Sequence, residues 1–331
     1  MVTKPMGKSL GVQPVHNASR RRLLLSGLGA GLALTNAGAL QASVTTEHSA
    51  LPFALPATPR ERIAGLMRLS AGIGTTSAYS NEGIIYGRSP GSLLRPLFGF
   101  VTVLEIRSEQ TGPGEYVTVQ KEAMVCIDIA TRQPLTEWHN PYIDRTIVPL
   151  GYVSPDNRYY FSEQGSYMRS ALPDDQAQRR LAELGVPQQS WHRSSEDVWV
   201  TERRYNRFPS AIGEEEFPEA YAGEIRESVD ILTYRGRIAD FADPDMDSVP
   251  STITMMADTP WPLWMMMGRR AGGTVWHGFG GKYGSLSNMA TATRAPIEAA
   301  YPGFLDDPWG FPAEAYGTAA QMRRLRAEGR M

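Results

Sequence analysis

Two histidines of this sequence lie in surroundings that suit proton transfer. His139 directly follows Trp138, and His277 directly follows Trp276 in a Gly-rich stretch. An imidazole titrates near neutral pH, so among aromatic side chains it can move a proton on an apolar substrate. We predict that His139 and His277 act as acid or base. The structural alternative at both positions is a histidine satisfied by a backbone carbonyl.

Three carboxylates stand on predicted strands beside apolar neighbours, namely Glu122, Asp128 and Glu202. A carboxylate on an inward face needs a partner, because an unpaired buried charge is costly. The cations available as partners are Arg95, Arg203 and Lys282. We predict Glu122 or Glu202 as the carboxylate that orients a catalytic histidine, with a buried ion pair as the alternative.

Patterns for nucleotides and metals are incomplete. Residues 278–282 resemble part of a phosphate-binding loop, but Trp276 stands where that loop needs Gly and Tyr283 where it needs Ser or Thr. No HxH or HExxH pattern occurs, although separated histidines can converge on zinc in a folded chain. The single cysteine, Cys126, lies in an apolar run typical of a core. We therefore predict no metal and no cofactor.

Trp, Met and Gly gather in residues 261–284, which we predict as two strands, 263–267 and 274–282, closed by a tight turn. Aromatic and Met side chains fill cores, but they also adapt to apolar ligands. The residues predicted to line a ligand pocket are Trp138, Trp199, Trp264, Met266, Trp276 and Lys282.

The remaining elements are predicted from capping and alternation patterns. Residues 58–61 have the pattern of a capping box, which predicts a helix that starts at Pro59. Alternating β-branched and aromatic residues predict strands at 84–86, 98–106, 116–129, 159–168, 198–206, 225–234 and 251–256, and helices are predicted at 173–184, 297–300 and 312–327. Many strands with few helices predict a mainly β fold, a large antiparallel lipocalin-like β-barrel with short peripheral helices. The barrel is predicted to be one domain, residues 58–331.

Three motifs carry a resemblance to a known family. They are Trp-x-Asn-Pro at 138–141, Tyr-Gly-Arg-Ser-Pro-Gly at 86–91 ahead of Leu97-Phe98, and Trp-Pro-Leu-Trp-Met at 261–265 followed by Met267-Gly268. Together they resemble the bacterial and fungal family known as domain of unknown function 1838, over roughly residues 66–308. The sequence departs from it at 128–132, where the family has Asp-Pro and Thr-Gly. The resemblance implies one folded unit and no particular reaction.

Residues 1–42 are predicted to be a twin-arginine export signal. Three arginines at 20–22 precede a Gly- and Ala-rich apolar run, and cleavage is predicted near Ala39 or Ala42. The mature protein would then be periplasmic, with the twin-arginine export machinery as a partner and residues 43–57 as a linker. A transmembrane anchor is the alternative, but Gly dilutes the run and it is barely long enough to span. We predict no stable membrane anchor.

Charge and cysteine content limit the partners. Removing the five cations of residues 1–42 leaves 28 of the 33 Lys and Arg against 35 Asp and Glu, a net charge of about −7. Nucleic acid is therefore not an expected partner, because binding it needs a basic face. One cysteine excludes an internal disulfide, which suits a protein that folds before export.

Two kinds of function stay open on the sequence alone. The first is a protein that encloses a small apolar molecule and transfers protons on it as a cofactor-independent isomerase, lyase or cyclase. The second is a non-catalytic periplasmic carrier or an interaction protein of the envelope. A carrier predicts a dry cavity without perturbed titratable groups, and an interaction protein predicts an exposed apolar patch.

Overall fold

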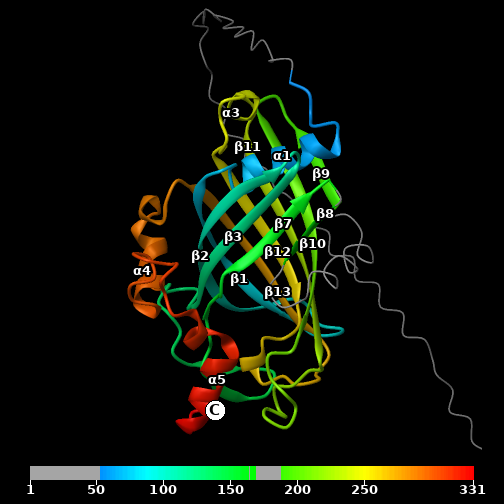
Figure 1. Ribbon diagram of the computed structural model, residues 1–331. Helices are drawn as coiled ribbons and strands as arrows, with labels where there is room; N and C mark the ends of the chain where they lie inside the picture. Colours follow the sequence, from blue (N-terminus) through cyan, green and yellow to red (C-terminus); the bar gives the residue numbers. More distant parts are fainter. Residues whose placement is uncertain (1–52, 164, 169–187) are drawn as a thin grey trace, which may run out of the picture. The chain divides into compact units, whose positions relative to one another are not determined.

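The computed structural model describes residues 53–163, 165–168 and 188–331. These residues belong to one compact unit, Ala50–Met331. Its main element is an antiparallel sheet of eleven strands, in the order β8-β7-β3-β2-β1-β13-β12-β11-β10-β9, with β6 paired to β3 (Figure 1). The prediction of a mainly β, antiparallel fold with few helices is confirmed.

The strands follow the predicted alternation closely. Those of the large sheet are β1 (Thr76–Arg88), β2 (Arg95–Gly112), β3 (Glu115–Ile127), β6 (Tyr152–Val153), β7 (Asn157–Ser162), β8 (Gly165–Met168), β9 (Gln188–Arg193), β10 (Asp197–Pro209), β11 (Ile225–Arg237), β12 (Ser251–Thr259) and β13 (Gly273–Tyr283). A separate pair joins β4 (Trp138–Asn140) to β5 (Arg145–Ile147). Residues 159–168, predicted as one strand, form the β7–β8 hairpin because the chain reverses between Ser162 and Gly165.

The large sheet is strongly curled, as the twist of neighbouring strands accumulates across it (Figure 1). Strand β7 lies next to one edge of the sheet and β10 next to the other. The guanidinium carbon of Arg204 on β10 nevertheless lies 5.5 Å from the ring centre of Tyr159 on β7. Among the described strands no backbone hydrogen bonds join the edge strands β8 and β9. The predicted closed barrel is therefore not confirmed, since side chains and not a backbone ladder bridge the two halves.

Strand β3 shows how the sequence assigns the two faces. The apolar end of one face, which carries Ala123, Val125 and Ile127, lies on the outside and packs against Ile297 of α4 (Thr291–Ala300). The mixed face of β3, which carries Glu122, points into the curl of the sheet. The more apolar face is thus outside, because a helix covers it there.

Helix α1 (Pro59–Ser70) closes one end of the curled sheet, near α3 (Ile238–Ala242). The Thr58 hydroxyl accepts from the Glu61 amide at 3.2 Å, and the Glu61 carboxylate accepts from the Thr58 amide at 3.0 Å. This confirms the predicted capping box. The buried side chains of α1 that pack on the inner face of the sheet are Ile63, Leu66, Met67 and Leu69.

The opposite end is closed by η1 (Leu263–Met265), α5 (Thr318–Ala327) and the β4–β5 pair. The prediction of a strand at 263–267 was wrong. Pro260 and Pro262 lack the N–H that a central strand donates, and the turn ends at Met266 with a φ of 55°. The predicted second strand, 274–282, lies within β13, which pairs with β12.

Two predicted helices have different bounds. The segment 312–327 divides at Gly317 into η3 (Ala313–Tyr316) and α5, and 297–300 is the last part of α4. A third short turn is η2 (Leu286–Asn288). The predicted helix 173–184 lies outside the described residues. None of the described helices has the length and apolar character needed to span a bilayer.

The loop after β3 contains a left-handed turn. Arg132 has a φ of 61°, a region that favours glycine. The Asp128 carboxylate accepts from the amides of Ala130 and Thr131 at 3.0 and 2.7 Å. These bonds stabilise the turn without a glycine.

Candidate functional site

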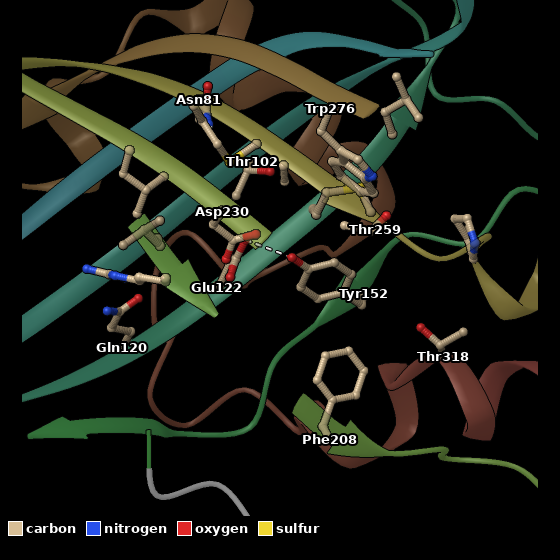
Figure 2. A pocket seen from close by; sticks show the side chains of 18 of the residues that line it. Asn81, Thr102, Gln120, Glu122, Tyr152, Phe208, Asp230, Thr259, Trp276 and Thr318 are labelled. Carbon is tan, nitrogen blue, oxygen red and sulfur yellow. Dashed lines mark hydrogen bonds between the residues drawn. The ribbon is translucent and has the colours of Figure 1, made fainter. Parts of the chain in front are cut away.

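A cavity of about 500 Å³ lies inside the curl of the sheet, between the cluster around α1 and the cluster around η1 (Figure 2). Its volume is within the range of small-molecule sites. The apolar part of its lining comes from both halves of the sheet and includes Ile85, Leu104, Met124, Leu232, Ile253 and Met255. Trp264 and Trp276 add aromatic surface.

Gly278, two residues after Trp276 on β13, leaves room for the polar side chain of Asn81 beside the cavity. A Cβ on Gly278 would lie 2.4 Å from Oδ1 of Asn81 and 2.7 Å from Cζ of Phe100. Only glycine therefore fits at this inward position of β13. The Asn81 amide, which lines the cavity, occupies the space above it.

Glu122 on β3 is the central polar group of the cavity. It accepts a hydrogen bond of 2.8 Å from the hydroxyl of Tyr152 on β6, drawn as a dashed line in Figure 2. Burial raises the pKa of Glu122, the bond from Tyr152 lowers it, and nearby Asp230 raises it, with a net upward shift. Burial also raises the pKa of Tyr152, and the charge of Glu122 adds to that shift. Tyr152 therefore stays a hydrogen-bond donor.

Asp230 on β11 points towards the same part of the cavity (Figure 2). It accepts a hydrogen bond of 2.6 Å from Nδ2 of Asn206 on β10. Burial raises the pKa of Asp230, while Asn206 and Arg204 oppose the shift. Strands β3 and β11 are far apart in the sheet order, so the curl brings these two carboxyl groups together.

A third carboxyl group behind this wall is held in an ion pair. Glu202 on β10 is fully buried, and its Oε2 lies 2.6 Å from Nη2 of Arg204. Burial opposes the charge of Arg204, but the pull of Glu202 raises the pKa of the guanidinium. The Arg204 charge is thus largely engaged by Glu202, and Glu122 and Asp230 take part in no ion pair among the described residues.

Two half-buried carboxyl groups with raised pKa values can differ in protonation, one neutral and one ionised. In that state one group can accept a proton from a bound molecule while the other donates one. No group of three or more His, Cys, Asp or Glu side chains suited to a metal converges among the described residues. The chemistry offered by the cavity itself is acid–base chemistry.

The structure separates the four predicted catalytic residues. Glu122 lines the cavity, and Glu202 is buried on the same inner face. His139 is exposed on β4, with Nε2 3.2 Å from Oδ1 of Asp144. His277 is exposed on the outer face of β13, because Trp276 before it points inward. Both histidines lie outside the cavity lining, and their catalytic role stays a prediction.

The predicted ligand-binding residues are likewise divided. Trp264 and Trp276 line the cavity, and Trp138 lies behind Trp264 with 6.4 Å between ring centres. Trp199 stacks on His192 at 5.8 Å, away from the lining. Met266 belongs to the end cluster near η1.

Lys282 lies at the end closed by α1. Its Nζ donates to the Arg68 carbonyl of that helix at 2.8 Å, and burial lowers its pKa to about 7. The ammonium therefore caps the last turn of α1 and does not reach the cavity lining.

Sequence reasoning missed Tyr152, Asp230, Arg204 and Asn206. Asp230 shares an inward face with Leu232 and Tyr234, so alternation along β11 contained a usable signal. Tyr152 belongs to a two-residue strand, which has no periodicity to read. The run 87–91 has the spacing of a nucleophile elbow, but it joins the antiparallel strands β1 and β2 and lacks the strand-to-helix turn.

The fold and the cavity define a mainly β protein whose curled antiparallel sheet surrounds a small-molecule-sized space. The family described as Protein of unknown function (DUF1838) matches residues 74–318, which is more than half of the chain. The chain belongs to this family, as the sequence motifs predicted. No curated protein matches the chain.

Proposed function

We propose that the cavity binds a small, largely apolar molecule and that Glu122 and Asp230 transfer protons on it. The reaction class is a cofactor-independent isomerisation, elimination or cyclisation. The observation that carries this proposal is the pair of carboxyl groups, from distant strands, that face one apolar cavity without an ion-pair partner among the described residues. Carboxyl groups with raised pKa values that face a cavity are candidates for acid–base roles.

The neighbours of the pair supply what proton transfer needs. Tyr152 stabilises the anion of Glu122, so this group can act as base. A ligand that fills the apolar part of the cavity would displace water there, which strengthens its electrostatic interaction with the carboxyl groups. One carboxyl group removes a proton from the ligand while the other returns a proton at a second atom.

The curled sheet serves in this proposal as a lipocalin-like container. The contact between Tyr159 and Arg204 joins its two halves, and Phe208 lines the cavity while 37% of its surface is exposed. Phe208 therefore marks the side where a ligand enters. An eight-stranded or larger curled sheet has room for one small ligand.

Solvent deuterium exchange tests the proposal without knowledge of the substrate. A pool of lipophilic ketones and enones is incubated with the protein in D₂O, and loss of carbon-bound protons is followed by NMR. We expect exchange in at least one bound compound, and loss of that exchange in Glu122→Gln. The matched control is Glu227→Gln, an exposed carboxyl group on the outer side of β11.

The predicted histidines are tested in the same assay. If His139→Gln/His277→Gln exchanges like the wild type, proton transfer belongs to the cavity carboxyl groups. Loss of exchange in a folded double variant would overturn the present assignment in favour of the histidines. Compounds that bind without any exchange would favour the carrier, which the apolar lining also suits.

We further propose that residues 1–42 direct twin-arginine export and that the mature protein works in the periplasm. The support is the arginine triplet at 20–22 and the diluted apolar run after it. Replacing all three arginines with lysine should retain the protein in the cytoplasm, as fractionation would show. Unchanged periplasmic recovery would contradict this route.

A further inference from the structure

The charges around the cavity do not balance once the buried ion pair beside it is counted. The lining carboxyl groups are Glu122 and Asp230, and Glu202, outside the lining, is paired with Arg204. The lining cations are Arg204 and Arg226. When all five groups are ionised, three negative charges stand against two positive ones, so the net charge of the site is −1.

Neither cation forms an ion pair with the two lining carboxyl groups among the described residues, although the charge of Arg204 acts on Asp230. Arg204 is bound to Glu202 through Nε at 2.9 Å and Nη2 at 2.6 Å. Arg226 donates from Nη2 to the Trp261 carbonyl at 2.9 Å, beside the end cluster at η1. The hydrogen bonds that Glu122 and Asp230 accept come from a neutral hydroxyl and a neutral amide.

The lining has one buried acceptor without a hydrogen-bond partner among the described residues, Oδ1 of Asn81 at 5% exposure, and one such donor, Nε of Arg226. Arg226 lies beside the end cluster at η1, where it donates from Nη2 to the Trp261 carbonyl. Buried acceptors without donors are costly, so a donor-rich ligand would be favoured. An acidic ligand would meet repulsion from the carboxyl pair.

We propose that the ligand of this cavity is a lipophilic amine, whose ammonium group lies between Glu122 and Asp230. An ammonium supplies the missing positive charge and up to three N–H donors on one small atom. The apolar and aromatic lining, including Trp264 and Trp276, receives the body of the molecule. This inference names the ligand class of the proposed function, and so rests on the same cavity.

A matched set of probes tests the ligand class by binding alone. Naphthylethylamine, naphthylethanol and naphthylacetate share a size and an aromatic body, and differ in charge at neutral pH. Their affinities are measured by isothermal titration calorimetry. We expect the amine to bind about tenfold or more tighter than the alcohol, and the acid weakest.

Substitutions then locate the ammonium. Asp230→Asn and Glu122→Gln keep the side-chain shape, and each should lower the affinity for the amine about tenfold while the affinity for the alcohol changes little. The control is Asp258→Asn, a half-exposed carboxyl group on β12 that pairs with Arg88 outside the cavity. It should leave all three affinities within about twofold.

Several outcomes would overturn the inference. Equal binding of amine and alcohol by the wild type would do so without any variant, and so would preferred binding of the acid. An amine preference that persists in both variants would place the ammonium elsewhere. Amine selectivity without deuterium exchange in any compound would reject the proposed catalysis and keep the ligand class. Exchange on ketones without amine selectivity would reject the ligand class and keep the proposed catalysis.

Discussion

Two carboxyl sites on the inner face of one sheet have opposite surroundings. Glu202 is fully buried and bound to a guanidinium, whereas Glu122 is bound to a tyrosine hydroxyl and faces a cavity beside Asp230. The first arrangement satisfies a charge and makes it inert. The second leaves a charge that a proton or a ligand must balance. The nature of the partner, a guanidinium or a neutral hydroxyl, therefore separates the structural carboxylate from the one that we propose to be reactive.

The largest expected effect comes from breaking the Glu202 ion pair. Arg204→Gln leaves Glu202 buried without a cation, and should lower the free energy of unfolding by about 3–5 kcal/mol. Urea denaturation measures this loss. Glu202→Gln/Arg204→Gln should recover a large part of it, because no charge then remains buried. A single variant as stable as the wild type would show that Glu202 is not held by this pair.

Substitution of Glu122 should affect chemistry and not stability. Glu122→Gln should reduce deuterium exchange about 10²- to 10⁴-fold, because it removes a group that transfers protons. Its free energy of unfolding should stay within about 1 kcal/mol of the wild type, since the amide loses a buried charge but keeps the shape. If Glu122→Gln lost as much stability as is expected for Arg204→Gln, both carboxyl sites would be structural and the distinction between them would fail.

The two sites should also differ in pH dependence. The folded-state pKa values of Glu122 and Asp230 are raised, so the native protein binds more protons than the unfolded chain between the ordinary value of about 4 and the raised values. Their contribution to stability is fully present below pH 4 and is lost as the pH rises through the raised values. Denaturation across this window should show the decline, and Asp230→Asn/Glu122→Gln should flatten it. A decline of the same slope in the double variant would assign it to other groups.

The smallest expected effect comes from Tyr152→Phe. Removing the hydroxyl withdraws a hydrogen bond from the Glu122 anion, which should raise the pKa of Glu122 further. The pH at which deuterium exchange is half-maximal should rise accordingly, while the free energy of unfolding falls by about 0.5–1.5 kcal/mol. An unshifted pH profile would show that Tyr152 only packs against Glu122.

Local signals in the sequence determined much of the frame. The capping box at residues 58–61 predicted where α1 begins, and alternation predicted the long strands and the two faces of β3. These patterns depend on neighbours within a few residues, so they can be read without the fold. Short motifs at 86–91, 138–141 and 261–265 also identified the family.

Only the tertiary structure decided which face of each strand encloses the cavity and which residues meet in it. Alternation placed His277 and Trp276 on opposite faces, but the curl of the sheet turned Trp276 inward and left His277 outside. The same curl brought Glu122 of β3 towards Asp230 of β11, strands that do not pair with each other. Contact between distant strands depends on the twist summed over the whole sheet, which no local sequence pattern encodes.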